Sequence, residues 1–304
     1  MENKAMNNTV IAVDKSGSYR VYLTLGTELA SEAAMIHGCS HTAAAALGRT
    51  LMATGLMGLM LKGERDRLTV QIKGDGPARE ILVCANSAGD VKGYISEPSV
   101  ELPLKSNGKL DVGGLVGKGT LTVIKDLGLR EPYVGRIDLV SGEIAEDFTQ
   151  YFMTSEQQPS SVALGVRMEE GAVASAAGMI IQVLPGADDE ALSALEDRLF
   201  FMDSLSLLAK DAMEPGPELP VRKLLRLIFS GMPERYMPEA LEERELRWHC
   251  DCSRERMERA LISIGKKDLS EIAEDGHAEL TCHFCRSSYD FDREELERLL
   301  REAK

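Results

Sequence analysis

Basic side chains are in short supply in this chain of 304 residues. Lysine and arginine number 35 against 49 aspartates and glutamates, so the formal net charge is −14 at pH 7. A surface of that sign repels the phosphates of nucleic acids and anionic membranes. Aromatic residues, at 5%, are also few. The composition therefore argues against a protein that binds nucleic acid through charge or base stacking.

The sequence also lacks the patterns that direct a chain to or through a membrane. The N-terminal MENKAMNNTVIAV does not have the basic-then-apolar order of a secretory signal. The most apolar window, residues 43–61, contains Arg49 and is followed by Lys62. It falls short of the ~20 predominantly apolar residues that a spanning helix needs. We therefore expect a soluble, cytoplasmic protein with no membrane partner.

Cysteine is scarce as well, with six residues, yet four of them fall in two short pairs near the C-terminus. Cys250 and Cys252 form a CxC pair, and Cys282 and Cys285 form a CxxC pair. Structural disulfides are rare in the cytoplasm, so clustered cysteines there indicate metal or redox chemistry. Four thiolates from two close pairs suit tetrahedral zinc, with Zn–S distances of ~2.3 Å. The sequence predicts one zinc ion held by these four residues.

Residues 1–183 read as an α+β domain. TVIAV (residues 9–13) and YRVYLTL (19–25) flank the turn DKSGS. Further strand patterns follow in seven runs: LTVQIK (68–73), REILVCA (79–85), VKGYI (91–95), TLTVIKD, VGRIDLV, SVALGVRM and GMIIQVL. Residues 28–62, rich in Ala, Leu and Met, predict helix with a break near Gly38. Because few long helices separate the strands, an antiparallel sheet with helices is favoured over a doubly wound parallel one.

Residues 184–239 predict an amphipathic helical linker. Pro185 and Gly186 end the preceding strand, and Asp188 or Asp189 can cap a helix. Phe200 and Phe201 widen the apolar face of that helix, along which apolar residues recur every three or four positions: Leu192, Leu195, Leu199, Met202, Leu205 and Leu208. Short helices are marginal in water, so these depend on a neighbour that covers them.

Residues 240–304 predict a small zinc-binding module. The segment between the cysteine pairs reads as one or two helices, with five apolar residues facing inward: Met257, Leu261, Ile264, Leu269 and Ile272. A module of ~60 residues is near the size at which a hydrophobic core alone becomes marginal. Structural zinc supplies on the order of 10–16 kcal/mol of apparent binding free energy in such modules, so removing the metal should unfold it.

Zinc-bound thiolates are already in the form that oxidants attack. Oxidation could pair Cys250 with Cys252 and Cys282 with Cys285, because cysteines two or three residues apart meet most readily in a disordered chain. Zinc would then leave, the module would unfold, and the apolar linker helices would be uncovered. The residues alone make such a switch physically available without showing that it is used.

Several long segments resemble the redox-regulated 33-kDa heat-shock chaperone family. CDCSRERMERALISIG and TCHFC carry the resemblance around the cysteines. KGDGPAREILVCANSAGDVKGY and FTQYFMTSEQQPSSVALGV carry it in the first domain, and MIIQVLPGADDE carries it at the junction with the linker. The mass of 33.2 kDa agrees with the family.

The resemblance implies a holdase, which is a chaperone that binds unfolding proteins without ATP and is not an enzyme. It implies that the reduced, zinc-bound form is inactive and that oxidative stress releases zinc and forms two disulfides, Cys250–Cys252 and Cys282–Cys285. The linker and module then unfold and the protein forms a homodimer. The candidates for binding of unfolding client proteins are then in the linker: Leu192, Leu195, Leu199, Met202 and Leu205.

Other classes of protein fit less well. A zinc-ribbon nucleic-acid-binding protein is the alternative, but residues 241–304 carry 12 Lys and Arg against 17 Asp and Glu. A zinc hydrolase needs an open ligand position, and four cysteines leave none. GGLVGKGT lacks the first glycine of a phosphate-binding loop and the Ser or Thr after Lys118. Cys39 and Cys84 are expected to be small buried hydrophobes.

Overall fold

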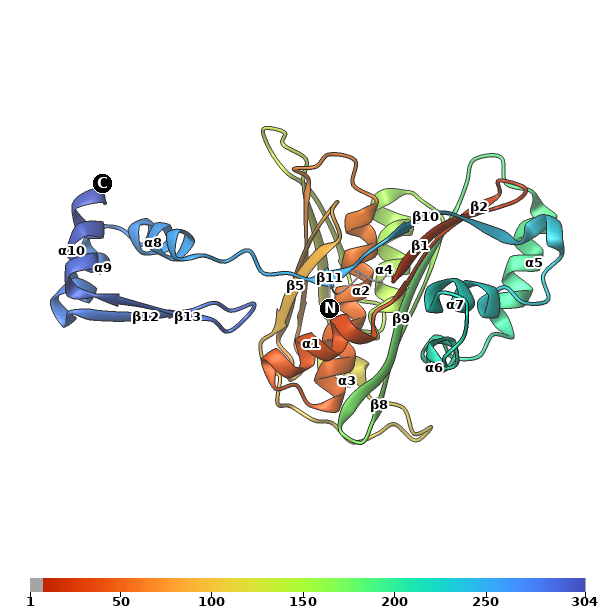
Figure 1. Cartoon of the computed structure of the whole chain (residues 1–304), viewed down its shortest axis with the longest axis horizontal. Coiled ribbons are helices and arrows are strands. Elements are labelled where there is room, and N and C mark those ends of the chain that lie inside the picture. The colour runs from red at the N-terminus through yellow and green to blue at the C-terminus, as the bar shows by residue number, and fades with distance from the viewer. Residues whose placement is uncertain (1–7, 304) are drawn as a thin grey trace. The chain divides into compact units, whose positions relative to one another are not determined.

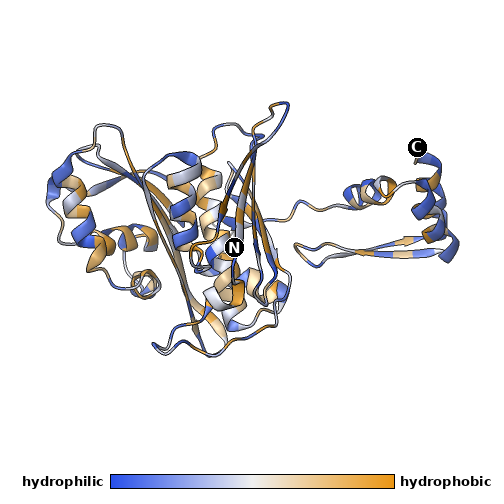
Figure 2. Cartoon of the chain, turned by 180° about the vertical axis from the view of Figure 1, so that it is seen from behind, coloured by the Kyte–Doolittle hydropathy of each residue, from blue (hydrophilic) through white to orange (hydrophobic). Residues whose placement is uncertain are grey.

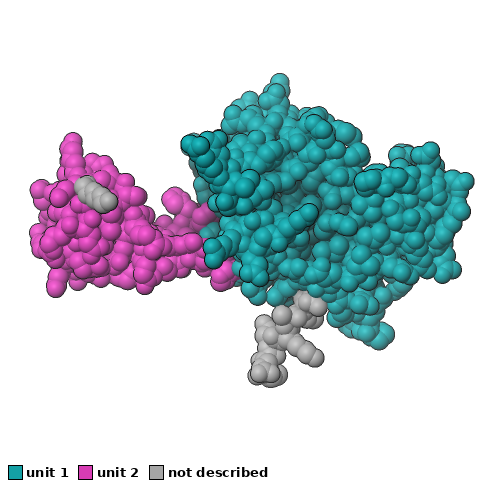
Figure 3. All heavy atoms as spheres, turned by 90° about the horizontal axis from the view of Figure 1, so that it is seen from above, with its two compact units in different colours: residues 1–248 teal, residues 249–304 magenta. Residues whose placement is uncertain are grey.

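The computed structural model describes residues 8–303 of a chain that divides into two compact units, residues 1–248 and 249–304 (Figures 1 and 3). The predicted α+β class with antiparallel sheets is confirmed. The second unit begins at His249 and not at residue 240, because residues 238–248 form β10 (Pro238–Arg244) and β11 (Arg247–Trp248), which pair with strands of the first unit. The predicted division into a core domain (residues 1–183), a linker (184–239) and a zinc-binding module (240–304) remains a prediction.

The first sheet has five strands in the order β10-β1-β2-β9-β8, all antiparallel. Its other strands are β1 (Thr9–Asp14), β2 (Tyr19–Leu25), β8 (Ser160–Glu169) and β9 (Ala172–Val183). The predicted hairpin at DKSGS is confirmed. Gly17 takes a left-handed φ of 75° in the turn, and the Asp14 carboxylate accepts hydrogen bonds from the backbone amides of Ser16 and Tyr19.

The second sheet has six strands in the order β11-β5-β4-β3-β6-β7. They are antiparallel except for β11, which runs parallel to β5. Its other strands are β3 (Arg67–Gly74), β4 (Glu80–Asn86), β5 (Asp90–Ile95), β6 (Gly119–Asp126) and β7 (Tyr133–Asp138). Short helical segments lie between strands: α3 (Val112–Val116), α4 (Ala145–Tyr151) and the π-helix η1 (Phe152–Glu156).

The core of the first unit is built around α2 (His41–Leu59), which packs against strands of both sheets. The break near Gly38 is confirmed, since α1 (Thr27–His37) ends there and Gly38 takes a left-handed φ of 61°. Nearly all of α2 is buried, including Leu51 and Met52. Its glycines allow close packing: a Cβ on Gly55 would lie 2.9 Å from the Leu246 side chain. Of residues 8–303, no helix is long and apolar enough to cross a membrane.

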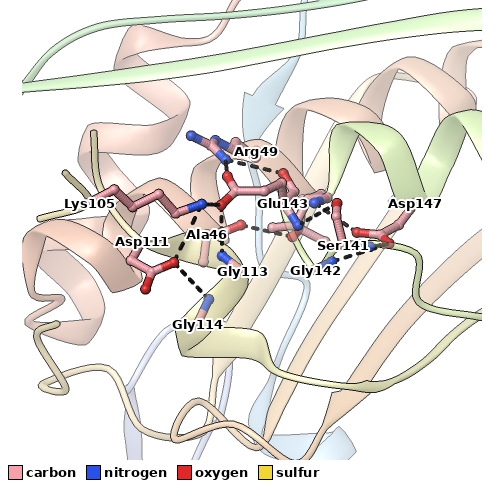
Figure 4. A network of polar contacts seen from close by, with 12 residues as sticks. Ala46, Arg49, Lys105, Asp111, Gly113, Gly114, Ser141, Gly142, Glu143 and Asp147 are labelled. Carbon is pink, nitrogen blue, oxygen red and sulfur yellow. Dashed lines mark hydrogen bonds and ion pairs between the residues drawn. The ribbon is translucent and has the colours of Figure 1, made fainter. Parts of the chain in front are cut away.

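A polar network joins the middle of α2 to neighbouring loops (Figure 4). Glu143 accepts hydrogen bonds from Arg49 Nη1 at 2.8 Å and from the Gly113 amide at 3.0 Å, and it pairs with Lys105. Burial alone would raise the pKa of the Glu143 carboxyl, but these hydrogen bonds outweigh it and hold the pKa below its usual value. The buried Asp147 carboxylate accepts hydrogen bonds from four amides of the preceding loop. The network accounts for a charged residue in an otherwise apolar helix.

The linker region forms helices that pack on the first sheet. They are α5 (Asp189–Phe200), α6 (Leu205–Met213) and α7 (Pro220–Ile228), followed by the short 3-10 helix η2 (Glu234–Tyr236). Asp188 caps α5 through the Glu190 amide, as predicted. The single helix expected through Leu208 is wrong, because Ser204 takes non-helical backbone angles and is the N-cap that precedes α6. Figure 2 shows hydrophobic and hydrophilic residues side by side on these helices.

The second unit has a small core of its own. Its elements are α8 (Arg254–Ser263), α9 (Lys266–Asp275), β12 (His277–Thr281), β13 (Ser288–Asp292) and α10 (Arg293–Glu302). Leu261 and Leu269 are buried as predicted, and Met257 and Ile272 pack against them. Ile264 is exposed, contrary to prediction, because it follows the last turn of α8, just before Gly265. Most of the remaining core comes from Phe291, Leu296 and Leu299 on β13 and α10.

Candidate metal centre

The four clustered cysteines come from two pieces of the second unit. Cys282 and Cys285 lie in the turn between β12 and β13. Within that turn the Cys282 amide donates to the Ser287 carbonyl at 2.9 Å, and the Arg286 amide donates to the Cys282 carbonyl at 2.9 Å. Cys250 and Cys252 lie in the extended segment before α8. Ser253 caps that helix and fixes where the segment ends.

The structure brings all four sulfur atoms within 4.8 Å of one another. Cys250 Sγ lies 3.7 Å from Cys282 Sγ, and Cys252 Sγ lies 3.3 Å from Cys285 Sγ. A tetrahedron with Zn–S bonds of ~2.3 Å has edges of about 3.8 Å, so the separations fit such a site. Four soft sulfur ligands in this geometry are typical of structural metal centres. The predicted clustering of the CxC and CxxC pairs is therefore confirmed, and the ligands and metal remain predictions.

The electrostatics differ from one sulfur to the next. Burial raises the pKa of the Cys250 thiol well above its usual range. Burial also opposes ionisation of Cys285, but its hydrogen bonds with the hydroxyl and the amide of Ser287 outweigh it and lower the pKa of Cys285 to about 6. A thiol cluster of this kind gains thiolates when a cation replaces its protons, which couples metal binding to proton release.

A tyrosine hydroxyl also reaches the cluster. Tyr289 Oη lies 3.1 Å from Cys252 Sγ. The hydrogen bond to Cys252 is the main cause that raises the pKa of Tyr289 to about 12, so the hydroxyl stays protonated at neutral pH. Sequence reasoning missed Tyr289 because its position beside the sulfur depends on how β12 and β13 pair. His249 and His283, which adjoin the cysteines in sequence, are exposed and lie outside the group of four.

The linker residues predicted to bind clients face the first sheet. Leu195 and Leu205 are buried among strand residues such as Leu23 and Met179, and two more residues pack against the same cluster, Leu199 and Met202. Leu192 is half-buried. The most accessible apolar side chains of this region are instead Phe200 and Phe201, at 82% and 76%, and Leu207 and Leu219 are exposed as well.

Cys39 and Cys84 lie in the first unit and are half-buried. Cys39 packs against the main core, and Cys84 Sγ lies 3.6 Å from Thr69 Oγ1 in the neighbouring strand. Both therefore belong to the packing of the two-sheet core, in half-buried positions and not the fully buried ones that the sequence suggested.

The fold and the site define an α+β protein with a C-terminal centre of four cysteines, of the kind used for metal binding or redox control. The comparisons with known proteins identify it further. A family model described as "Hsp33 protein" matches residues 7–292. The chain therefore belongs to the Hsp33 family.

Individual relatives agree over nearly the full length. The "33 kDa chaperonin" of Ruminiclostridium cellulolyticum is 48% identical, with 94% of this chain and 95% of the relative covered. The "33 kDa chaperonin" of Bacillus subtilis is 43% identical, with 97% and 98% covered. The crystal structure of the 33 kDa chaperonin from Thermotoga maritima has a TM-score of 0.84 at 34% identity and covers 97% of this chain and 98% of its own. The chain is accordingly a molecular chaperone and not an enzyme, and the nucleic-acid-binding alternative is left without support.

Proposed function

We propose that this chaperone is a redox-regulated, ATP-independent holdase of the bacterial cytoplasm that binds unfolding proteins under oxidative stress. The observation that carries the proposal is the gathering of four cysteine sulfurs within 4.8 Å in a small unit of its own. Family membership supports the chaperone part of the proposal. The thiol cluster supports the redox part.

One zinc ion would be held by Cys250, Cys252, Cys282 and Cys285. When bound, zinc keeps four thiolates side by side and adds binding free energy to a unit whose core is small. That core has seven buried side chains, so the metal is a large part of what holds the unit together. The four sulfurs leave no open ligand position, which suits a structural role.

Peroxide is the oxidant in the simplest balanced scheme. A first thiolate attacks one peroxide oxygen, the O–O bond breaks, hydroxide leaves and a sulfenic acid forms. A second thiolate attacks that sulfur, the S–S bond forms and a second hydroxide leaves. Two peroxides thus yield two disulfides, which we assign as Cys250–Cys252 and Cys282–Cys285. The sulfurs that lie 3.7 and 3.3 Å apart belong to cysteines of different pairs, whereas the proposed disulfides join the two cysteines within each pair.

Unfolding of the module would then release the linker helices from the first sheet. Leu192, Leu195, Leu199, Met202 and Leu205 are the proposed client-binding residues. Four of them pack on the sheet in this state, which fits a form with low affinity for clients. The exposed Phe200 and Phe201 would extend the same surface. The oxidised protein is proposed to act as a homodimer.

The test measures zinc, thiols and chaperone activity in one experiment. The purified reduced protein should contain about one zinc ion per chain. Peroxide at raised temperature should release it, form two disulfides and begin to suppress aggregation of an unfolding client. A variant with Cys39→Ser and Cys84→Ser should behave the same way, because neither thiol belongs to the cluster. Release of zinc with no gain of chaperone activity would contradict the proposal.

A further inference from the structure

Two hydroxyl groups in β13 and the turn before it contact sulfurs of the cysteine cluster. Tyr289 Oη lies 3.1 Å from Cys252 Sγ, and Ser287 Oγ lies 3.2 Å from Cys285 Sγ. One cysteine of the CxC pair and one cysteine of the CxxC pair are therefore each contacted by a hydroxyl. The Tyr289 side chain is half-buried and packs against the core of the second unit, so its hydroxyl is held in place by the body of the side chain.

The contact of Tyr289 crosses between the two pieces of the site. Tyr289 belongs to the hairpin that carries Cys282 and Cys285, whereas its hydroxyl meets Cys252 on the segment before α8. The hydrogen bond thus joins the two pieces independently of any ion. Ser287 acts within the turn itself, where its carbonyl also accepts the Cys282 amide.

Two arginines that follow Cys250 and Cys252 at the start of α8 are paired with carboxylates, so neutral donors suit this cluster. Four thiolates around a divalent ion leave an excess of two negative charges. Arg254 donates to Glu295 at 2.6 Å, and Arg256 pairs with Asp251 at 2.7 Å. A donor to a thiolate stabilises its charge and lowers the electron density that attacks an oxidant. A hydroxyl does both without adding a charge.

We propose that Tyr289 and Ser287 are positioning residues of the redox switch, whose hydroxyls hydrogen-bond to the sulfurs of Cys252 and Cys285 and thereby set how much oxidant is needed to release the metal. The inference rests on the proposed function, since it concerns the same centre. In the first oxidation step the attacking thiolate donates an electron pair to peroxide, and hydroxide leaves. Removing a donor leaves that electron pair less stabilised, so the step becomes faster.

The test replaces each hydroxyl and leaves the rest of the side chain. In Tyr289→Phe we expect zinc to pass to a chromophoric chelator about tenfold faster without oxidant, the lower end of the usual effect of a lost outer hydrogen bond. Half of the zinc should also leave at a lower peroxide concentration. Ser287→Ala should shift both readouts in the same direction.

The controls lose a comparable hydroxyl that does not touch sulfur. Tyr133 donates to the Ser155 carbonyl at 3.0 Å in the first unit, and Ser288 Oγ lies 3.2 Å from Thr281 Oγ1 in the same hairpin. Tyr133→Phe and Ser288→Ala should release zinc at the rate of the unaltered protein. Far-ultraviolet circular dichroism of each reduced variant checks that the second unit is folded.

A spectroscopic readout separates positioning from general loosening. With Co²⁺ in place of zinc, the sulfur-to-cobalt charge-transfer band should move to longer wavelength in Tyr289→Phe, because the lost donor raises the energy of the sulfur electrons. Unchanged zinc release, or faster release with an unmoved band, would overturn the inference while leaving the proposed function intact. If the unaltered protein binds no metal, the proposed function fails first.

Discussion

Glu143 keeps its charge at a place where burial works against it. Its side chain is partly buried between α2 and the loops around it, and the donors Arg49, Lys105 and Gly113 converge on it. These donors hold the pKa of the carboxyl below its usual value. A carboxylate with a depressed pKa in the folded state stabilises that state above the pKa of the unfolded chain. This contribution is lost as the pH falls through the folded-state pKa.

Glu143→Gln should therefore destabilise the first unit at neutral pH and much less in acid. Loss of hydrogen bonds to a charged group, with Arg49 left behind, costs about 2 kcal/mol. The difference in unfolding free energy from the unaltered protein should shrink as the pH falls below ~4.3, where an unfolded glutamate becomes protonated. Urea unfolding across this pH range measures it. Glu234→Gln is the control, since Glu234 is highly exposed and pairs only across the surface with Lys15. Equal effects of both changes would contradict the prediction.

At the cluster of four cysteines, the sequence predicts the cysteines and not their neighbours. Spacing alone identifies Cys250, Cys252, Cys282 and Cys285, because a tetrahedral thiolate site is built from close pairs. Tyr289 could not be found this way. Its place beside Cys252 depends on hairpin register, in which Tyr289 lies opposite Leu280. Register is set by the geometry of the turn and by which face of the hairpin is buried, and the spacing of the cysteines gives neither.

At the scale of elements, the amphipathic pattern of the linker predicts helices but neither their separation nor the surface on which they pack. Period and Pro–Gly punctuation predict α5 and its cap at Asp188. They do not show that α5 and α6 are separate helices, since Phe201 and Met202 continue the apolar pattern through the break. The surface on which the helices pack, the face of the first sheet, is far away in sequence. Only the folded chain brings it under Leu205 and Leu208.

The strands also include one that no apolar pattern in the sequence predicts. Alternating and apolar runs predict β1 to β9, because those strands pack on the core. The charged segment PEALEER gives no such signal, yet it forms β10 at the edge of the first sheet, where most of its side chains are exposed. Edge strands tolerate charge because one side of their backbone and most of their side chains meet water. Backbone pairing with β1, and not side-chain burial, places this strand.

The prediction that packing of the linker helices keeps the reduced protein inactive can be tested on α6. A carboxylate is introduced on its buried side in one variant and on its exposed side in another. Leu205→Asp places a carboxylate in the cluster on the first sheet, so it should weaken packing of α6 by ~2–5 kcal/mol and give partial chaperone activity without oxidant. Leu207→Asp is the control, because Leu207 lies on the same helix and is exposed. Aggregation assays on both reduced proteins measure the difference. A Leu205→Asp protein that stays folded and inactive would count against this packing argument.

At the scale of the whole molecule, residues 238–248 are the covalent connection between linker and cysteine module. We call them the connecting segment. β10 pairs with β1, and β11 pairs with β5, so the segment is hydrogen-bonded to both sheets of the first unit. Leu246 is 2% accessible in the main core, and its amide and carbonyl bond to the Asn8 side chain at 2.8 Å each. Loss of structure in the module can spread along the chain to α7 only if this segment detaches.

Weakening the connecting segment should therefore ease activation without changing the metal centre. Leu246→Ala removes a buried side chain at a cost of ~2–5 kcal/mol. We expect faster amide hydrogen exchange in residues 238–248 than in β3, and chaperone activity at a lower temperature for a given dose of peroxide. Zinc release from the reduced protein should keep its rate, because Leu246 does not touch the cysteines. Leu241→Ala is the matched control, since Leu241 lies in β10 and is 68% accessible. If both variants need the same temperature, the segment does not limit release of the linker.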